Sequence, residues 1–394
     1  MKKNNKAEMS VKAETSVKTE KKQAKAKKVS NKVSGEKLTI GIDLGDKTSR
    51  YCSLDAQGEK VAEKSVATTK EGMTKAFGAM EPCRTVLEVG THSPWVSRLL
   101  KSFGHEVIVA NPREVRLISG SNRKNDKLDA YTLARLARVD PDLLRPIQHR
   151  SEKAQTALLQ IRVRAALVET RTGLINTARG LVKALGDRLP KCDADQMGVK
   201  QAATLPAEIQ QELKPLLEQV ESLTEKIKAS DAQLERMAET EYPETKLHQQ
   251  VWGVGTLISL TYVLTVEDPK RFEKSRDTGC YVGLRPRQRD SGDSRPQLGI
   301  TKEGDEYLRK LLVQGAQRIL CQKAPDTDLK RWGLKLCERG GKNAKKRAVV
   351  AVARKLAVLL HSLWVTGEVY EPLRHSNARA AAAAAAAAQS RVAA

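Results

Sequence analysis

Strand-like runs between residues 38 and 110 constrain the fold of this chain more than any other feature. The stretch KLTIGIDLGDKTSRYCSLDAQGEKVAEKSVATT contains three β-type runs separated by GDK and AQGE, which is typical of an antiparallel meander. Two short strands, RTVLEV and EVIVAN, follow, and a helical segment precedes each of them. A meander followed by strands that alternate with helices predicts a mixed α/β sheet.

Two long helical patterns follow the sheet. Apolar residues recur at a 3,4 spacing from Leu158 to Val182 and again from Ile209 to Met237. Heptads sustained over about four turns each predict coiled-coil seams. The segment LPKCDADQMG interrupts the pattern between them. An antiparallel hairpin within one chain and a stalk that joins subunits both fit this arrangement.

The remaining segments differ in composition. A mainly helical region begins near Leu247, with a centre rich in Gly, Pro and Arg, whereas both chain ends are of low complexity, which predicts disorder at the ends. The expected domains are a disordered basic arm (1–36), an α/β domain (37–150), a helical coiled-coil stalk (151–243), a mainly α C-terminal domain (244–374) and an alanine-rich disordered tail (375–394).

Charge narrows the choice of partners. The chain has 70 Lys and Arg against 47 Asp and Glu, a formal net charge of +23. A protein this basic attracts polyanions, and nucleic acid is the leading candidate. No apolar run reaches the roughly 18 residues of a spanning helix, so no membrane partner is expected. Aromatic residues make up only 4% of the chain, which argues against extensive base stacking on aromatic platforms.

The six cysteines indicate the compartment. They are widely scattered, without a C-x-x-C pair or a companion His spacing. This argues against a zinc site and against a disulfide framework. No apolar stretch follows the charged N-terminus, so no signal peptide is expected. A reducing cytoplasm is the expected location.

Four carboxylates occupy positions suited to a metal site. Asp43 ends the first strand, Glu88 ends a later strand, and Asp126 and Asp129 open the helix in SNRKNDKLDAYTLARLARV. If the two strands lie side by side, all four carboxylates can converge at one edge of the sheet, where they would repel one another. Two Mg²⁺ ions about 4 Å apart would offset the repulsion, with phosphate oxygens completing the shells.

Simpler roles for these residues fit the sequence as well. Asp126 could cap its helix, and Asp129 could compensate the helix dipole in the first turn. The stretch IGIDLGDKTS is also similar to the first phosphate hairpin of sugar kinases and actin-like ATPases. Those proteins need a second, Asp-Gly-Gly-type hairpin, and the sequence shows none.

A second motif, GCYVGLRPRQRDSGDSRPQLGITKEGDEYLRKLL, surrounds a serine with cations. Arg285 and Arg287 precede Ser291, and Lys302 and Arg309 follow it. Arginines can hold a phosphodiester bidentately, and a serine among them could attack phosphorus and store the bond energy as a phosphoserine. A Ser-Gly pair in a basic loop is otherwise usually a turn.

Two further segments are candidates for contact with nucleic acid. VWGVGTLISLTYVL resembles a helix-hairpin-helix turn, in which Gly253 and Gly255 would expose backbone N–H groups to a DNA phosphate. A plain helix–helix turn also fits. The helix predicted over Arg339–Trp364 has a basic start and an apolar face, which suits either a nucleic-acid backbone or a solvated surface.

The order Asp43, Glu88, Asp126, Asp129, together with RKNDKLDAYTLARL, resembles the DEDD transposases of bacterial insertion sequences, the "one-ten" and "eleven-eleven" families. The C-terminal motif is similar to the same family's Gly-Leu-x-Pro-x-Gln, Ser-Gly and Ile-x-Lys-x-Gly pattern. The resemblance implies an RNase H-like domain, similar to the RuvC resolvase, with the four carboxylates holding Mg²⁺. It also implies Ser291 as the nucleophile.

The chain departs from the family pattern in its C-terminal motif. Asp293 follows Gly292 where a second glycine is common, and Glu303 and Asp305 stand where basic or neutral residues are usual. Extra negative charge beside a phosphate site would affect the level of activity. Ser294 is the alternative nucleophile.

The resemblance further implies a transposase or site-specific recombinase whose partners are DNA, at element ends and target, and a structured guide RNA. A homo-oligomer, dimer or tetramer, in the bacterial cytoplasm at the nucleoid is expected. Three other functions fit parts of the sequence. They are a DEDD nuclease that resolves junctions by water attack, a non-catalytic nucleic-acid-binding relative, and an actin-like kinase.

Overall fold

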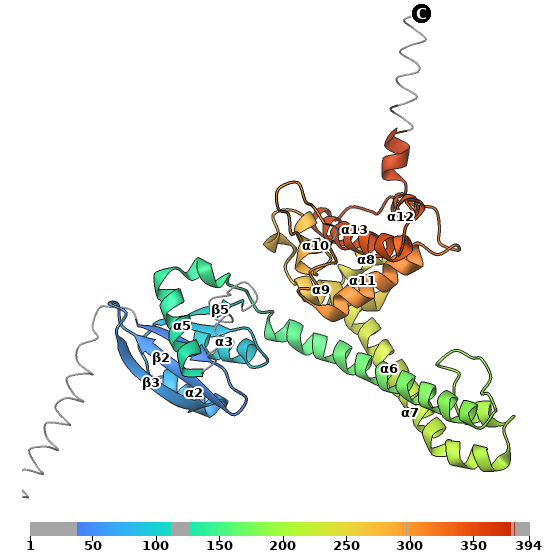
Figure 1. The fold of residues 1–394 in the computed structure, drawn as a ribbon, viewed down its shortest axis with the longest axis horizontal. Coiled ribbons are helices and arrows are strands. Elements are labelled where there is room, and N and C mark those ends of the chain that lie inside the picture. The colour runs from blue at the N-terminus through green and yellow to red at the C-terminus, as the bar shows by residue number, and fades with distance from the viewer. Residues whose placement is uncertain (1–37, 112–125, 297, 380–381, 383–394) are drawn as a thin grey trace, which may run out of the picture. The chain divides into compact units, whose positions relative to one another are not determined.

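The computed structural model describes residues 38–111, 126–296, 298–379 and 382, without the side chains of residues 126–128. The predicted basic arm and most of the alanine-rich tail lie outside the described residues. The chain divides between His149 and Arg150 into two compact units (Figure 1).

The first unit contains a five-stranded sheet with the strand order β3-β2-β1-β4-β5. Its strands are β1 (Thr39–Asp43), β2 (Thr48–Leu54), β3 (Lys60–Ala67), β4 (Arg84–Glu88) and β5 (Glu106–Ala110). β1 to β3 form the predicted antiparallel meander, whereas β4 pairs in parallel with both β1 and β5. This mixed sheet confirms the predicted α/β class and is consistent with an RNase H-like domain.

Helices cover both faces of the sheet. They are α2 (Lys70–Phe77), α3 (Ser93–Ser102) and α5 (Asp126–Val139), and a 3-10 turn, η1 (Pro141–Leu144), follows α5. α2 and α3 bury Phe77 and Leu100 against the face that carries Ile40 and Ile42. α5 packs on the opposite face through Leu133 and its alanines. Successive residues of a strand point to opposite faces. Alternate residues of the strands therefore pack against α2 and α3 on one face and against α5 on the other.

α5 lies directly on the backbone of β1. A Cβ atom on Gly41 would be only 2.0 Å from the carbonyl oxygen of Ala130 and 2.6 Å from the backbone nitrogen of Ala134. Glycine is therefore required at position 41 by the close approach of the helix, and small residues on α5 complete the contact. This contact fixes the position of α5 along β1.

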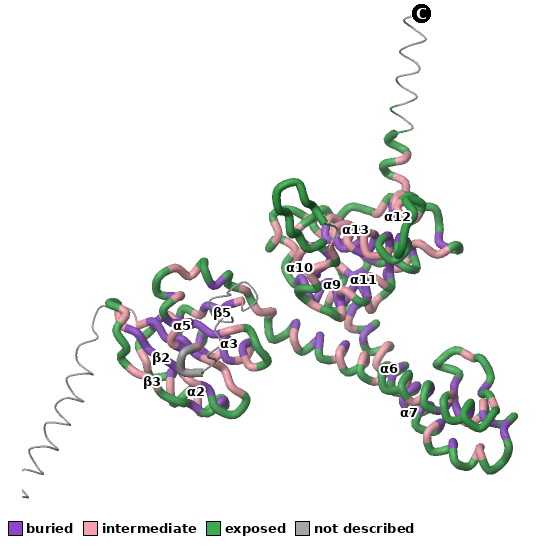
Figure 2. Tube along the Cα trace, viewed as in Figure 1, coloured by how far each residue is buried: buried purple, intermediate pink, exposed green. Residues whose placement is uncertain are grey.

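The second unit begins with a helical hairpin. α6 (Glu152–Ala184) and α7 (Ala207–Thr240) are antiparallel, because Leu158 near the start of α6 clusters with Leu234 near the end of α7. At the other end, Val182 clusters with Leu213 and Leu217. Figure 2 shows the buried residues of both helices alternating with exposed ones. The chain therefore forms the intrachain hairpin, and pairing of subunits through these helices stays a prediction.

The rest of this unit is mainly helical, with α13 (Ala344–Thr366) at its centre. The other helices are α8 (Thr245–Gln249), α9 (Thr256–Val266), α10 (Arg276–Tyr281), α11 (Glu306–Ile319) and α12 (Asp328–Glu338). One 3-10 turn, η2 (Val199–Ala202), lies between α6 and α7, and another, η3 (Pro269–Arg271), follows α9. α13 contributes Val352, Leu356 and Leu360 to the largest apolar cluster. The mainly α character predicted for this region is confirmed.

One expectation about apolar runs is wrong. Among the described helices, α13 has the length and mean hydropathy of a membrane-spanning segment. Its buried residues, however, form the centre of the second unit's core. A helix that packs an apolar face into a protein core can resemble a spanning helix in sequence, because both have long apolar stretches.

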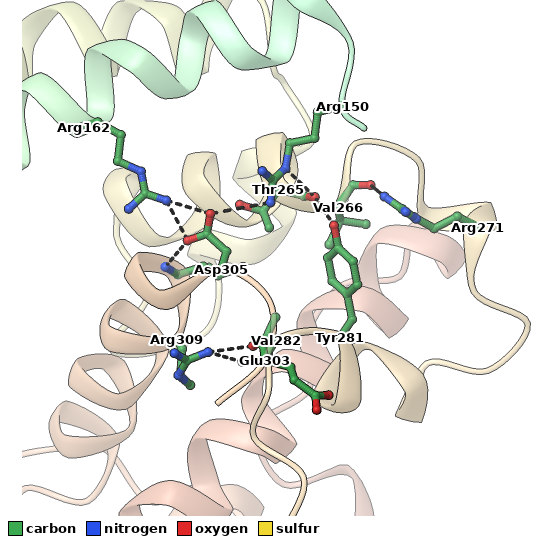
Figure 3. A network of polar contacts seen from close by, with 11 residues as sticks. Arg150, Arg162, Thr265, Val266, Arg271, Tyr281, Val282, Glu303, Asp305 and Arg309 are labelled. Carbon is green, nitrogen blue, oxygen red and sulfur yellow. Dashed lines mark hydrogen bonds and ion pairs between the residues drawn. The ribbon is translucent and has the colours of Figure 1, made fainter. Parts of the chain in front are cut away.

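A buried carboxylate fastens α11 to α6 (Figure 3). Asp305 caps α11 by accepting a hydrogen bond from the N–H of Leu308 at 2.9 Å. Its two carboxylate oxygens accept hydrogen bonds of 2.8 and 2.7 Å from Nη2 of Arg162. Arg150 lies 3.5 Å away and donates to the carbonyl of Thr265 in α9. Only 6% of the Asp305 side chain is exposed. Asp305 joins α11 to α6 through Arg162, and Arg150 extends the network to α9.

The charge of Asp305 contributes to stability. Burial raises its pKa, but the Leu308 N–H, Arg162 and Arg150 outweigh burial and hold the pKa below the ordinary value. A carboxylate with a depressed folded-state pKa stabilises the fold above the unfolded-state pKa and loses that effect as pH falls through the folded-state value. The contribution is therefore present at neutral pH and lost in strong acid.

We predict that Asp305→Ala lowers the free energy of unfolding by about 3 kcal/mol, because it removes a helix cap and leaves Arg162 without its partner. Chemical denaturation at neutral pH measures the loss. Asp326→Ala is the matched control, since Asp326 pairs with Arg331 on the exposed surface and should have little effect. Equal stability of Asp305→Ala and wild type would show that the network contributes nothing.

A second prediction concerns His248, which is fully buried against the rings of Tyr262 and Trp364. Burial lowers its pKa to about 4, against smaller opposing effects of the Leu360 and Ser259 backbone. The unfolded chain takes up this proton near pH 6.5, so stability should fall as pH drops from 6.5 toward 4, by about 2 kcal/mol at pH 5. Denaturation curves at pH 7.5 and 5 measure the change.

His248→Phe keeps an aromatic ring at this position and cannot titrate. It should remove most of the difference in stability between the two pH values. If the variant keeps the full difference, another group is responsible for the pH dependence.

Candidate active site and nucleic-acid interface

Two of the predicted carboxylates lie at the same end of neighbouring strands. β1 and β4 are parallel, and Ile42 is paired with Leu87. Asp43 and Glu88 are the next residues and the last of their strands. Both are half-buried. The register therefore brings the two positions together at the carboxyl edge of the sheet.

The direction of α5 brings the other pair to this edge. Ala130 of α5 contacts Gly41 near the end of β1. The carbonyl of Ala137, two turns later, accepts a hydrogen bond of 3.0 Å from Arg84, which begins β4. α5 therefore runs antiparallel to both strands. Its first turn, from Asp126 to Asp129, lies at the strand ends that carry the other two carboxylates.

The side chains at this edge are described only in part. Asp129 is half-buried, whereas the side chain of Asp126 lies outside the described residues. Asp43, Glu88 and Asp129 each take part in a polar interaction. Among the described side chains, no three His, Cys, Asp or Glu residues are gathered closely enough to hold a metal ion. Carboxylate oxygens are nevertheless the donors that Mg²⁺ prefers, so the donor set fits.

A histidine that sequence reasoning left without a role lies beside this edge. His92, in the loop after β4, accepts a hydrogen bond of 3.1 Å at Nδ1 from Nε1 of Trp95. Its Nε2 lies 3.5 Å from the exposed carboxylate of Asp46, which follows β1. Both residues follow the same strands as the predicted pair. Their position directly after these strands is the sequence feature that could have pointed to them. No fixed sequence spacing, however, connects an aspartate in one loop to a histidine in another.

Ser291 lies at the tip of a hairpin whose described residues are 283–296 and 298–302, here called the arm. The N–H of Arg287 donates to the carbonyl of Gly299 at 2.9 Å, and the N–H of Thr301 donates to the carbonyl of Arg285 at 2.9 Å. Ser291 and Ser294 exchange backbone hydrogen bonds of 3.1 and 3.0 Å. Gly292 supplies a φ of +54° at the turn, as a tight hairpin requires. The turn expected of Ser-Gly is therefore present.

Ser291 is exposed, and its hydroxyl has no activating contact with the described residues of its own unit. None of the hydrogen bonds formed by the described residues involves its Oγ, and Arg285 donates instead to Gln288 at 2.6 Å. A serine hydroxyl needs a base or another activating group to act as a nucleophile at neutral pH. Activation of Ser291 would therefore have to come from outside the arm.

Two predicted nucleic-acid ligands have structural contacts. Nη1 of Arg309 donates to the carbonyls of Val282 and Glu303, at 3.2 and 2.7 Å, and so holds the base of the arm (Figure 3). Gly253 has a φ of +87°, and a Cβ there would lie 2.9 Å from the Gly315 carbonyl oxygen in α11. Helix packing therefore accounts for Gly253 without a ligand.

The other predicted ligands are more open. Gly255 precedes α9, is exposed and has no atom within 4 Å of a Cβ built on it. Arg285 and Arg287 are exposed along the arm, and Lys302 is exposed at its base with a φ of +60°. Asp305, in contrast, faces Arg162. Its charge is paired inside the protein, so it adds little negative charge to the arm.

Two family models match the chain. A transposase model covers residues 40–186, which include the four carboxylates. A model of the transposase IS116/IS110/IS902 family covers residues 246–330, which include the arm. The two matches fall on the two regions that the sequence motifs singled out.

Curated relatives agree with the family models. The transposase for insertion sequence element IS1111A of Coxiella burnetii is 29% identical, over 84% of this chain and 90% of the relative. The transposase for insertion sequence element IS1328 of Yersinia enterocolitica is 30% identical, over 72% and 84%. A probable family 20 transposase of Pseudomonas aeruginosa is 27% identical, over 84% and 98%. By these matches, the chain belongs to the IS110 family of transposases.

Proposed function

We propose that this transposase cuts and rejoins DNA strands with Mg²⁺ held by Asp43, Glu88, Asp126 and Asp129. The observation that carries the proposal is the common edge at which β1 and β4 end and α5 begins. Half-buried carboxylates can reach an ion while the protein holds their backbone in place. Two bound Mg²⁺ ions would supply Lewis-acid stabilisation of the phosphate charge.

We further propose Ser291 as the nucleophile. Its Oγ would bond to phosphorus while the bridging P–O bond to the neighbouring nucleotide breaks. Attack by a DNA hydroxyl on the phosphoserine would then restore a phosphodiester, so rejoining needs no ATP. Exposed arginines on the same arm, Arg285 and Arg287, would hold the non-bridging oxygens. The exposed tip of the arm supports this role, because a large substrate can reach it.

Three partners are proposed with this chemistry. DNA follows from the family, and a structured guide RNA is suggested by the resemblance and by the net charge of +23. A homo-oligomer is suggested by apolar side chains on α6 that the hairpin leaves exposed, among them Leu159 at 61% and Val163 at 51%. We propose that these partners meet at the nucleoid.

A second candidate function is a DEDD nuclease that uses water as the nucleophile. One observation favours it, since the Ser291 hydroxyl has no activating contact within the described part of its own unit. In that reaction the same carboxylates act, and no covalent protein–DNA intermediate forms. The two functions therefore differ in one measurable product.

We predict that Asp43→Asn, Glu88→Gln, Asp126→Asn and Asp129→Asn each reduce Mg²⁺-dependent strand cleavage by at least about 100-fold, since each removes a charged metal ligand. Binding of DNA should change little. Asp46→Asn is the matched control, because Asp46 follows the same strand and is 90% exposed. Chelation by EDTA should abolish cleavage, and added Mg²⁺ should restore it. Near-normal cleavage by Asp126→Asn would contradict the assignment.

We also predict that Ser291→Ala abolishes strand exchange and any covalent adduct while leaving DNA binding intact. Ser294→Ala, on the other strand of the same turn, is the control and should be milder. Denaturing electrophoresis of the protein with labelled DNA and guide RNA, followed by mapping of the modified peptide, measures both. Cleavage by wild type without an adduct, or an adduct at another residue, would favour water attack.

A further inference from the structure

A groove in the second unit is not used by the proposed chemistry. It has a volume of about 1150 Å³ and is bounded by the arm, by α12 and by one face of α13. Its floor is apolar and includes Leu284, Ile300, Trp332, Leu336 and Val350. Pockets for small ligands usually have about 300–1000 Å³, so this groove suits part of an extended molecule.

The rim of the groove is strongly basic. Of the 20 described residues that line it, seven are Lys or Arg and none is Asp or Glu. None of the ion pairs between described residues involves these cations. Their charge is therefore available to a ligand, and the ligand should be a polyanion.

The cations on α13 form a row. Lys346 and Arg347 line the groove two turns before Arg354 and Lys355, with Val350 and Ala351 on the turn between them. Eight residues of a helix span about 12 Å along its axis, so the two pairs could contact phosphates about two nucleotides apart in an unstacked strand. The stem of Arg354 lies over Gly279, where a Cβ would be 2.9 Å from its Cγ. The Lys355 ammonium lies 4.1 Å from the centre of the Trp332 ring.

The apolar floor distinguishes between forms of nucleic acid. A duplex presents phosphates outward and keeps its bases stacked inside, so it would leave the floor facing charge. An unpaired strand can place bases on the floor and phosphates on the rim. Among the described lining residues, the polar side-chain groups apart from the cations are Asn343 and the indole N–H of Trp332. The lining therefore offers few side-chain partners for a 2′-hydroxyl, which favours DNA over RNA.

We propose that this groove binds an unpaired stretch of a DNA strand, with bases against the floor and phosphates along the α13 row. The inference rests on the proposed function only for the identity of the polyanion. It adds a single-strand site formed by residues other than the four carboxylates and Ser291. A DNA rearrangement has to part the two strands locally, and such a groove would hold one of them.

The test measures binding by fluorescence anisotropy with the full-length protein. The probes are a short labelled DNA strand that cannot pair with itself, the same strand as RNA, and the corresponding DNA duplex. Lys346→Ala/Arg347→Ala tests the rim, and Lys323→Ala/Lys335→Ala is the matched control, since it removes two exposed cations outside the groove. Leu336→Ser tests the floor, with the exposed Leu334 on the same helix as control in Leu334→Ser.

The rim variant should weaken single-strand DNA binding by about tenfold and reduce the slope of log affinity against log salt by about 1.4, the effect of two lost phosphate contacts. Leu336→Ser should weaken single-strand binding by about fivefold, within the range of a lost base contact. It should leave duplex binding unchanged. Both controls should behave like wild type.

Several results would overturn the proposal. These are normal single-strand binding in the rim variant, equal losses for single strand and duplex in both variants, tighter groove-dependent binding of RNA than of DNA, or equally effective competition by polyglutamate. The proposed function is judged separately, because its variants are read by cleavage and by the covalent adduct. Single-strand binding without any cleavage would contradict that function and leave the groove standing. Cleavage by the wild-type protein, together with normal single-strand binding by the groove variants, would contradict the groove proposal and leave the proposed function standing.

Discussion

The contact between α5 and β1 at Gly41 determines the geometry of the candidate metal site. A side chain at this position would collide with the backbone of α5, and the helix would have to move away from the strand. The strands alone bring Asp43 and Glu88 together, through their parallel register. The aspartates of α5 reach the same edge only because the helix lies in van der Waals contact with the sheet and runs in the opposite direction.

Charge is used in two different ways in the second unit. Asp305 is removed from water, and its helix cap and two arginines satisfy it, so it acts as a structural joint. The lysines and arginines of the groove have no acidic partners among the described residues. Burying a charge is favourable only when partners replace water. Surface cations that lack such partners remain available for a polyanion.

The sequence predicted those features that depend on local patterns. β-type runs separated by turn residues predicted the meander and the strand ends at Asp43 and Glu88, and the C-terminal motif pointed to the arm. The hairpin was one of two open alternatives, because a heptad does not specify which helix is its partner. Leu217 is buried in this hairpin, and the neighbouring Leu216 packs against the same cluster partly buried.

Features that depend on distant residues could not be predicted from spacing. Asp305 looked like a source of negative charge near a phosphate site, but its partner Arg162 is 143 positions away. Gly253 looked like a phosphate ligand, yet packing against Gly315 explains it. The Asp126 side chain lies outside the described residues, and the four-carboxylate site remains a prediction.

The antiparallel packing of α6 and α7 has a consequence for the order of folding. Their contacts form within one continuous segment, and local contacts of this kind close faster than distant ones. During synthesis the N-terminal part of a chain is available first, so the hairpin can form before residue 305 is made. Arg162 would then already lie in a folded helix when Asp305 is synthesised. The later helices could then pack against the preformed hairpin.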